Sequence, residues 1–221
     1  KTYDGTTNAT ITNAGTLSVN YDGDNLAIVI GKAAYDNKNV GTDKAVSFAG
    51  FELSGSAAGN YKLITQPADK TADITAKEIT INGATVEGSK VYDGTVEAKI
   101  TNAGTLSDNY DGENLTIVTG SAAYDNKNVG TGKTVAFTGF ALAGDAAGNY
   151  TLASQPADTA ADITVKEITI NGAAVEASRI YDGTTDAKIT NAGAPSVNYD
   201  GENLKVAAGK AAYDNKNVGK G

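Results

Sequence analysis

Short runs of apolar and β-branched residues alternate with clusters of Gly, Asn and Asp along the whole chain. Residues 9–12 and 44–53 alternate between apolar and polar side chains, residues 25–31 form a short apolar run, and residues 72–81 alternate and are rich in Ile and Thr. Runs of this length between turn-forming clusters predict strands. Residues 54–61 are expected to form one turn of helix at most.

Two further patterns concern single strands and their connections. The sequence Tyr-Lys-Leu-Ile-Thr, which begins at Tyr61, predicts another strand. Asn82-Gly83 lies between two β-type runs, and Asn171-Gly172 repeats this arrangement. Because both central residues of a type I′ turn need a positive φ, an Asn-Gly pair in this setting predicts a two-residue β-hairpin.

The strands predict an all-β fold with about six or seven strands in each domain. Two sheets, or a sheet and a cover, are needed to bury the apolar half of each alternating strand. We therefore expect small β-sandwich modules of immunoglobulin-like proportions, arranged end to end. A β-grasp-like module with a short helix is the alternative.

The chain is a tandem repeat with a period of 89 residues. The copies span residues 1–89, 90–178 and 179–221, and the third one is incomplete. A period of this length fits a small domain better than one turn of a solenoid. From the strand pattern we expect three structural modules, at residues 1–77, 78–166 and 167–221.

The incomplete third copy raises two possibilities for the chain. The sequence begins inside a motif and without Met, so we expect it to be part of a longer protein. The half module is then either a cut end or a donor that pairs with another chain by strand exchange, since exposed strand edges recruit partners.

Composition excludes several function classes. Cys, His, Met and Trp are absent, which removes thiol nucleophiles, disulfides and the usual zinc and haem ligands. The net charge of −8 opposes contact with nucleic acid or anionic lipid, and no run of apolar residues is long enough to span a membrane. The carboxylates lie in turns, where water keeps their pKa ordinary, so we expect no enzyme.

Calcium is the main chemical alternative, because acidic side chains and amides gather in the turns. A lysine inside each Asp-Asn-Lys-Asn loop would repel a cation, and Asp and Asn in turns usually bond their own backbone. We therefore expect no cofactor, with calcium as the alternative. The candidate calcium ligands are Asp22, Asp24, Asp111 and Glu113.

Two motifs are candidates for an interaction site. The sequence AAYDNKNVG is unchanged in all three copies and combines an aromatic ring with amides, as glycan-binding surfaces do. Its candidate ligand residues are Tyr35, Asn37, Tyr124, Asn126, Tyr213 and Asn215. The sequence Lys/Arg-x-Tyr-Asp-Gly-Thr opens each copy and is predicted to form a turn at the junction between repeats. Its junction residues are Tyr3, Asp4, Gly5, Tyr92, Asp93, Gly94, Tyr181, Asp182 and Gly183.

An intramolecular isopeptide bond is a further possibility for a domain that bears load. Lys77 and Lys166 lie on the strongest predicted strand. The neighbours Glu78 and Glu167 point to the opposite face of that strand, so neither can supply the carboxylic acid that this reaction needs.

The order of motifs in each full copy resembles the YDG repeat of large bacterial surface proteins. The motifs are K-x-YDGT, AAYDNKNVG, GF-x-L-x-G, AGNY-x-L and ADIT-x-KEITI, and the third copy contains the first two. The resemblance implies an extracellular stalk or spacer in an adhesin similar to filamentous haemagglutinin. Such a stalk projects a distal region that binds host or surface glycans and proteins in cell adhesion and biofilms. A multivalent glycan- or matrix-binding repeat, stabilised by calcium, is the alternative.

Overall fold

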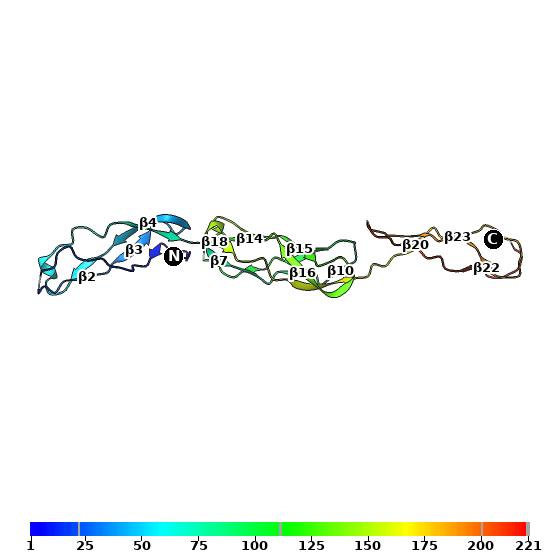
Figure 1. Ribbon diagram of the computed structural model, residues 1–221, viewed down its shortest axis with the longest axis horizontal. Helices are drawn as coiled ribbons and strands as arrows, with labels where there is room; N and C mark the ends of the chain where they lie inside the picture. Colours follow the sequence, from blue (N-terminus) through cyan, green and yellow to red (C-terminus); the bar gives the residue numbers. More distant parts are fainter. Residues whose placement is uncertain (22, 111, 200, 220–221) are drawn as a thin grey trace. The chain divides into compact units, whose positions relative to one another are not determined.

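The computed structural model describes residues 1–21, 23–110, 112–199 and 201–219 (Figure 1). These residues form many short strands, and their helical elements are two 3-10 turns, η1 (Ala58–Asn60) and η2 (Ala147–Asn149). The predicted all-β fold of tandem β modules and the single helical turn in residues 54–61 are thus confirmed. No helix in the described ranges has the length and apolar character needed to cross a bilayer.

The chain divides into two compact units that share the second copy. The first unit comprises Lys1–Val86, Lys99–Ala122 and Phe137–Asp158. The second unit comprises Glu87–Ala98, Ala123–Ala136 and Thr159–Gly221. Each unit therefore contains contacts between residues of two successive copies, and these contacts form the sites described below.

The first copy forms a four-stranded sheet in the order β1-β3-β4-β6 and a separate pair, β2 with β5. From Lys44 onward, β4 alternates between half-buried or buried side chains and exposed ones, as its sequence predicts, and Gly50 follows it with a φ of 72°. The strands are β1 (Asn8–Ala9), β2 (Ala27–Val29), β3 (Lys32–Tyr35), β4 (Gly41–Ala49), β5 (Glu52–Ser54) and β6 (Lys70–Ile74).

The rest of the first unit consists of paired short strands. Residues 77–86, here named the arm, contain β7, β8 and β9 and pair with later segments of the second copy. β7 runs parallel to β18, while β8 and β9 run antiparallel to β13 and β12. The strands are β7 (Lys77–Ile79), β8 (Ile81–Asn82), β9 (Thr85–Val86), β12 (Ile100–Asn102), β13 (Thr105–Leu106), β14 (Thr116–Val118), β17 (Ala141–Ala143) and β18 (Tyr150–Leu152).

The predicted Asn-Gly hairpin is wrong. β8 and β9 do not pair with each other, and only Gly83 of the Asn82-Gly83 pair has a positive φ, of 74°. Gly83 instead bends the arm, and Gly104 bends the facing segment, where an added Cβ would lie 2.6 Å from the Asn82 carbonyl oxygen. The partners of the arm come from residues 100–106, so a local turn rule could not identify them. The same arrangement recurs around Gly172, where the end of the second copy pairs with residues 189–195 of the third copy.

A five-stranded sheet in the order β10-β19-β16-β15-β11 is centred on the second unit. β10 adds to it in parallel, with Lys90 opposite Ile163. Three further strand pairs are β20 with β24, β21 with β23 and β22 with β25, in which β20 and β21 come from the end of the second copy and the other four strands from the third copy. The strands are β10 (Ser89–Val91), β11 (Glu97–Ala98), β15 (Ser121–Tyr124), β16 (Gly130–Thr138), β19 (Thr159–Thr164), β20 (Ile170–Asn171), β21 (Ala174–Val175), β22 (Asp186–Ala187), β23 (Ile189–Asn191), β24 (Ala194–Pro195) and β25 (Ala211–Ala212).

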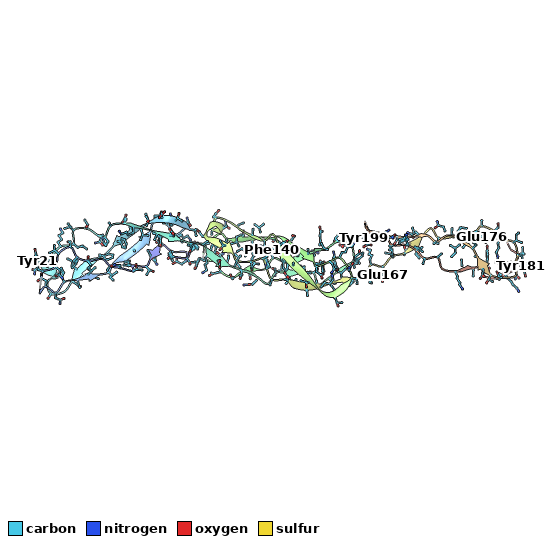
Figure 2. All side chains as sticks on the ribbon, viewed as in Figure 1. Tyr21, Phe140, Glu167, Glu176, Tyr181 and Tyr199 are labelled. Atoms are coloured by element: carbon cyan, nitrogen blue, oxygen red, sulfur yellow. The ribbon has the colours of Figure 1, made fainter. Side chains whose placement is uncertain are left out.

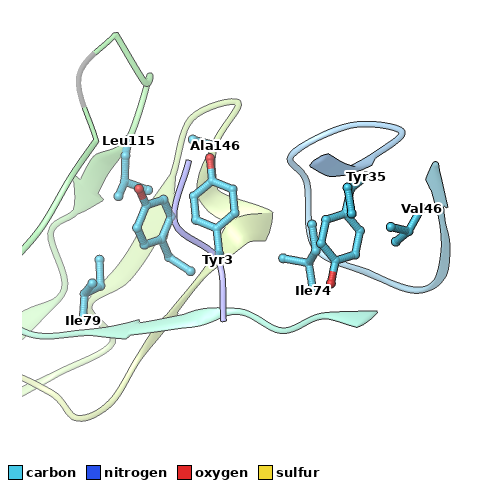
Figure 3. Packing of buried hydrophobic residues seen from close by; sticks show 9 residues of the cluster. Tyr3, Tyr35, Val46, Ile74, Ile79, Leu115 and Ala146 are labelled. Carbon is cyan, nitrogen blue, oxygen red and sulfur yellow. The ribbon is translucent and has the colours of Figure 1, made fainter. Parts of the chain in front are cut away.

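The largest core of the first unit draws its residues from two copies of the repeat. Tyr3 and Ile74 are each 1 % exposed, and Ile79 of the arm is 2 % exposed. They belong to a single cluster that buries apolar area from the first sheet, the arm and the second copy, which favours folding. The cluster comprises Tyr3, Ala33, Tyr35, Val46, Ile74, Ile79, Leu115, Ala146 and Tyr150 (Figure 3).

Candidate functional site

The sequence Lys/Arg-x-Tyr-Asp-Gly-Thr forms the same turn in each copy, here named the tyrosine turn (residues 1–6, 90–95 and 179–184). In the first copy, the Asp4 carboxylate accepts the backbone N–H and the hydroxyl of Thr6, both at 2.9 Å. Gly5 follows with a φ of 75°, a conformation that a side chain disfavours. The same bonds and a positive φ recur at Asp93, Gly94 and Thr95, and at Asp182, Gly183 and Thr184.

The cation of each tyrosine turn links it to the AAYDNKNVG loop of the same copy. Lys1 bonds Asp4 at 2.7 Å and two backbone carbonyls, and its ammonium lies 5.3 Å from the centre of the Tyr35 ring. Lys90 lies 5.4 Å from the Tyr124 ring, and the Arg179 guanidinium lies 4.9 Å from the Tyr213 ring. These are cation–π distances. The two motifs, far apart in sequence, therefore form one structure.

The tyrosines and asparagines predicted as ligand residues are engaged inside this structure. Tyr35 and Tyr124 are buried, and their hydroxyls donate to the carbonyl oxygens of Asp73 and Asp162. The side-chain oxygens of Asn37, Asn126 and Asn215 each accept the backbone N–H two residues later. Lys44 and Lys133 also bond the first two of these amides at 2.8 Å. The loop is thus held by its own polar groups, and it presents the lysine at its centre.

Glu113 joins the first copy to the second. Its carboxylate accepts the ammonium of Lys38 at 2.6 Å and the hydroxyl of Tyr150 at 2.6 Å, and it also accepts the hydroxyl of Tyr3. The Glu113 side chain is 4 % exposed, whereas Lys38 is 42 % exposed. Tyr3 and Lys38 belong to the first copy, and Tyr150 belongs to the second. We name these four residues the Glu113 cluster.

Three tyrosine rings pack beside this carboxylate. The Tyr3 ring meets Tyr110 edge to face at 5.8 Å and meets Tyr150 edge to face at 5.4 Å. An added Cβ at Gly5 would lie 3.1 Å from the Tyr110 ring, so the glycine also allows the turn to approach closely. Edge-to-face pairs of buried rings stabilise such contacts by about 0.5–1.5 kcal/mol each beyond their area.

The second unit repeats this junction one period later. The Tyr92 ring meets Tyr199 edge to face at 5.7 Å, and Lys127 bonds Glu202 at 3.2 Å. The Lys127–Glu202 pair and the Lys38–Glu113 pair have the same sequence separation of 75 residues. Glu202 is more exposed, at 23 %, than its counterpart. The structure therefore places Tyr3 and Tyr92 against the next copy, while Tyr181 is 57 % exposed.

Two further contacts of the junction have partners that sequence reasoning did not single out, namely Asn149 in one and Asp108 and Tyr110 in the other. The buried Asn149 amide oxygen accepts the Val40 N–H at 2.9 Å, and its NH2 group donates to Asn39. Lys77 of the arm bonds the Asp108 carboxylate at 2.6 Å and the Tyr110 hydroxyl at 2.8 Å. These partners of Lys77 are a carboxylate and a phenol, and neither is the Asn amide that an isopeptide bond requires.

The pKa values of the cluster follow from this geometry. Burial alone would raise the pKa of Glu113, but the hydrogen bonds from Lys38, Tyr150 and Tyr3 outweigh it and hold that pKa below its ordinary value. Burial, together with the neighbouring Glu113 carboxylate, raises the pKa of the Tyr3 and Tyr150 hydroxyls. The bond to Glu113 raises the pKa of Lys38. The cluster is thus an ion pair with two neutral donors at neutral pH.

Two of the candidate calcium ligands, Asp22 and Asp111, lie outside the described residues. Glu113 accepts an ammonium, which repels a metal ion, and Asp24 accepts the Tyr61 hydroxyl. Within the described ranges, no group of three acidic side chains is arranged to hold a metal ion. Calcium binding by these turns stays a prediction.

Comparison with known proteins gives one match. The model of the YDG domain matches residues 1–71, 75–160 and 164–221, which together span most of the chain. No curated protein matches the chain. No solved structure matches it.

Proposed function

The chain belongs to the YDG domain family, and we propose that it is a structural spacer in the stalk of a bacterial cell-surface adhesin. In this role the repeats hold a distal binding region away from the cell. One observation carries the proposal. The same pair of contacts, tyrosine on tyrosine and lysine on glutamate, joins the first copy to the second and the second copy to the third.

The connection between successive modules also supports a spacer. β6 ends at Ile74 and the arm begins at Lys77, so two residues separate the sheet of the first copy from the arm, which pairs with strands of the second copy. The first of these, Thr75, bonds the backbone of Tyr3 and Lys1 at 2.8 Å. A connection this short and this well bonded has little freedom to bend, as a stalk requires.

The alternative role, a multivalent glycan- or matrix-binding repeat, has weaker support. Its candidate rings, Tyr35 and Tyr124, are buried beneath the cations of the tyrosine turns. Its candidate amides, Asn37 and Asn126, already bond backbone and lysine. We propose a mechanical role without catalysis, because the Glu113 carboxylate, whose side chain is 4 % exposed, serves as the bonding partner of three side chains.

Small-angle X-ray scattering of the chain in solution tests the spacer role. We expect the profile of a stiff rod, with the same maximum dimension with and without EDTA. A compact particle, or a dimension that depends on EDTA, would contradict the proposal. A glycan and matrix-protein array probed with the same chain is expected to remain blank, and specific binding would favour the alternative role.

A further inference from the structure

Tyrosine is the side chain of this protein that is most open to oxidation. The sequence contains no Cys, Met, Trp or His and has 11 Tyr. Cys and Met are common first targets of oxidants, and Trp and His compete with Tyr for the same reagents. Because these competitors are absent, oxidation is directed to the tyrosines, and its product depends on how the tyrosine rings are placed.

The tyrosine rings that contact one another lie in the two junctions. Tyr3 meets Tyr110 and Tyr150 edge to face, with ring centres 5.8 and 5.4 Å apart, and Tyr110 also contacts Tyr150. Tyr92 meets Tyr199 in the same way, at 5.7 Å. Elsewhere in the described part of the chain, no two tyrosine rings are in contact. Rings at these separations touch along an edge, so two neighbouring radicals can couple after small rotations of the side chains.

The surroundings of the first junction favour oxidation of Tyr3. Its hydroxyl donates to the Glu113 carboxylate, which can take the phenol proton as an electron leaves. Tyr110 instead accepts a bond from the Lys77 ammonium at 2.8 Å, and that ammonium lies 4.7 Å from the centre of its ring. A nearby positive charge opposes the loss of an electron. Tyr3 itself is 1 % exposed, and the half-buried Tyr110 ring connects it to the surface.

Tyr110 is a better coupling partner for Tyr3 than Tyr150 is. Tyr150 donates to the same Glu113 carboxylate, at 2.6 Å, and one carboxylate can take up only one proton. Tyr110 and Tyr199 occupy the same position of the repeat, and each lies against the tyrosine that opens the preceding copy. The same pairing is therefore available at both junctions.

We propose that peroxide, acting through a haem peroxidase, joins successive copies covalently as dityrosine, linking Tyr3 to Tyr110 and Tyr92 to Tyr199. Each ring loses one electron and its hydroxyl proton to become a phenoxyl radical. The two radicals form one bond between the ring carbons beside the hydroxyls, and the hydrogen on each of these carbons then moves to the oxygen. Two electrons and two protons have left the protein, and they reduce one hydrogen peroxide to two waters. At the first junction, the Tyr3 proton leaves through Glu113.

The link goes beyond the proposed spacer role and does not depend on it, because the ring contacts are present before oxidation. A linked chain would hold each copy to the next even where the hydrogen bonds of the junction open. Failure to form the link would leave the scattering result for the untreated chain unchanged, so the two proposals fail independently.

Mass spectrometry of the oxidised chain tests both links. The purified chain is treated with a plant peroxidase and hydrogen peroxide and is then digested with trypsin. Tryptic peptides 91–99 and 189–205 contain one tyrosine each, so a joined pair that has lost two hydrogen atoms identifies the link between Tyr92 and Tyr199. Fragmentation of the joined peptides that contain Tyr3 and Tyr110 locates the first link.

Tyrosine-to-phenylalanine variants assign the links, because phenylalanine keeps the ring but cannot form a phenoxyl radical. Tyr110→Phe is expected to abolish the first link and Tyr199→Phe the second, and each variant should leave the other link at full yield. The control is the double variant Tyr21→Phe and Tyr181→Phe, at side chains that are 69 % and 57 % exposed (Figure 2). We expect it to form both links normally. Circular dichroism checks that each variant is folded.

A mixture of isotope-labelled and unlabelled chains shows whether the links form within one chain. We expect both peptides of a linked pair to carry the same label. Pairs of mixed label in statistical proportion would overturn the proposal, since they would show that tyrosines of different chains react. The absence of both linked pairs, or their loss in the control variant, would also overturn it.

Glu113→Gln tests the route of the proton. The amide oxygen can still accept the Tyr3 hydroxyl but cannot take its proton at neutral pH. We expect the first link to form several times more slowly and the second to keep its rate, while near-ultraviolet circular dichroism shows unchanged tyrosine packing. Slowing of both links, or of neither, would contradict the role of Glu113 as the proton acceptor.

Discussion

Glu113 shows how one side chain can join two repeats. Its carboxylate accepts bonds from Lys38 and Tyr3 of the first copy and from Tyr150 of the second. The aspartate at the corresponding position of the first copy, Asp24, is one methylene shorter and accepts Tyr61, the counterpart of Tyr150. Either acid can therefore accept the tyrosine hydroxyl of its own copy, whereas the junction in the first unit uses the longer side chain, that of Glu113.

Glu113→Gln is expected to destabilise the first unit by about 1–3 kcal/mol, because the buried amide keeps one acceptor but loses its charge-assisted bonds. Glu202→Gln is the matched control. Its carboxylate is more exposed, so the expected loss is below about 1 kcal/mol. Urea denaturation followed by circular dichroism measures both. Equal losses for the two variants would contradict the burial argument.

The stability of the junction is expected to depend on pH at both extremes. The pKa of Glu113 is lowered from an ordinary value of 4.5, so its contribution is present above pH 4.5 and is lost as the pH falls through the folded pKa. The pKa values of Tyr3 and Tyr150 are raised above 10.0, so stability also declines as the pH rises beyond 10. Between these limits we expect a plateau.

Thermal unfolding of the unchanged chain and of Glu113→Gln across this pH range isolates the loss of stability in acid that is due to Glu113. Other carboxylates contribute a background, since bonds from Lys90 and Thr95 outweigh burial and lower the pKa of Asp93 to about 2. The difference between the two proteins should vanish in acid and reach its full size above pH 4.5. A constant difference would contradict the role of the Glu113 charge.

The sequence identified the residues of the tyrosine turn but not the partners of the junction. Asp4, Gly5 and Thr6 are adjacent, and turn chemistry depends on near neighbours. Lys38 and Glu113 lie 75 residues apart, in different copies. No spacing within one repeat predicts that contact. The available signal was the recurrence of a lysine, a tyrosine and an acid in register, which fits a calcium site or a junction equally well.

At the scale of elements, the tyrosine turn combines a strained backbone with close packing. Gly94 has a φ of 80°, and an added Cβ would lie 2.9 Å from Tyr199. Gly183 has a nearly identical φ of 81°, but nothing lies within 4 Å of its added Cβ. Substitutions at these two glycines therefore distinguish the cost of backbone strain from the cost of a clash across the junction.

Gly183→Ala is expected to cost about 1–2 kcal/mol, the strain of an alanine in the left-handed region. Gly94→Ala carries the same strain and also pushes Tyr199 away from Tyr92, so its cost should be larger. Thermal denaturation of the two single variants, compared with the unchanged chain, measures the difference. Equal losses would indicate that Tyr199 does not pack on this turn.

Strand prediction succeeded where a strand is specified locally and failed where it depends on a distant partner. The alternation in residues 44–53 correctly predicts β4 and β5, with a break at Gly50. The predicted strand at Tyr61 is absent, whereas its counterpart β18 forms in the second copy, because the arm is there to pair with it. The single strand predicted for residues 72–81 is divided among β6, β7 and β8.

At the scale of the whole molecule, the sequence shows the repeat, but it does not show which copies contact each other within one compact unit. The all-β class and the tandem organisation follow from the pattern and the period. The two compact units nevertheless divide the second copy between them, because the arm and the junction contacts tie each copy to the next. Sequence similarity marks where a motif recurs, and it carries no information on which copy supplies its partner.

The central claim is that successive copies are held in a fixed register by the tyrosine turn and the Glu113 cluster. The chain has no cysteine, so Ser47→Cys and Thr116→Cys place one spin label in the first copy and one in the second without background. Pulsed electron–electron double resonance then reports the distribution of distances between them. We predict one narrow distribution that broadens when Tyr3→Ala and Glu113→Gln are added. A broad distribution in the otherwise unchanged chain, insensitive to these substitutions, would contradict the claim.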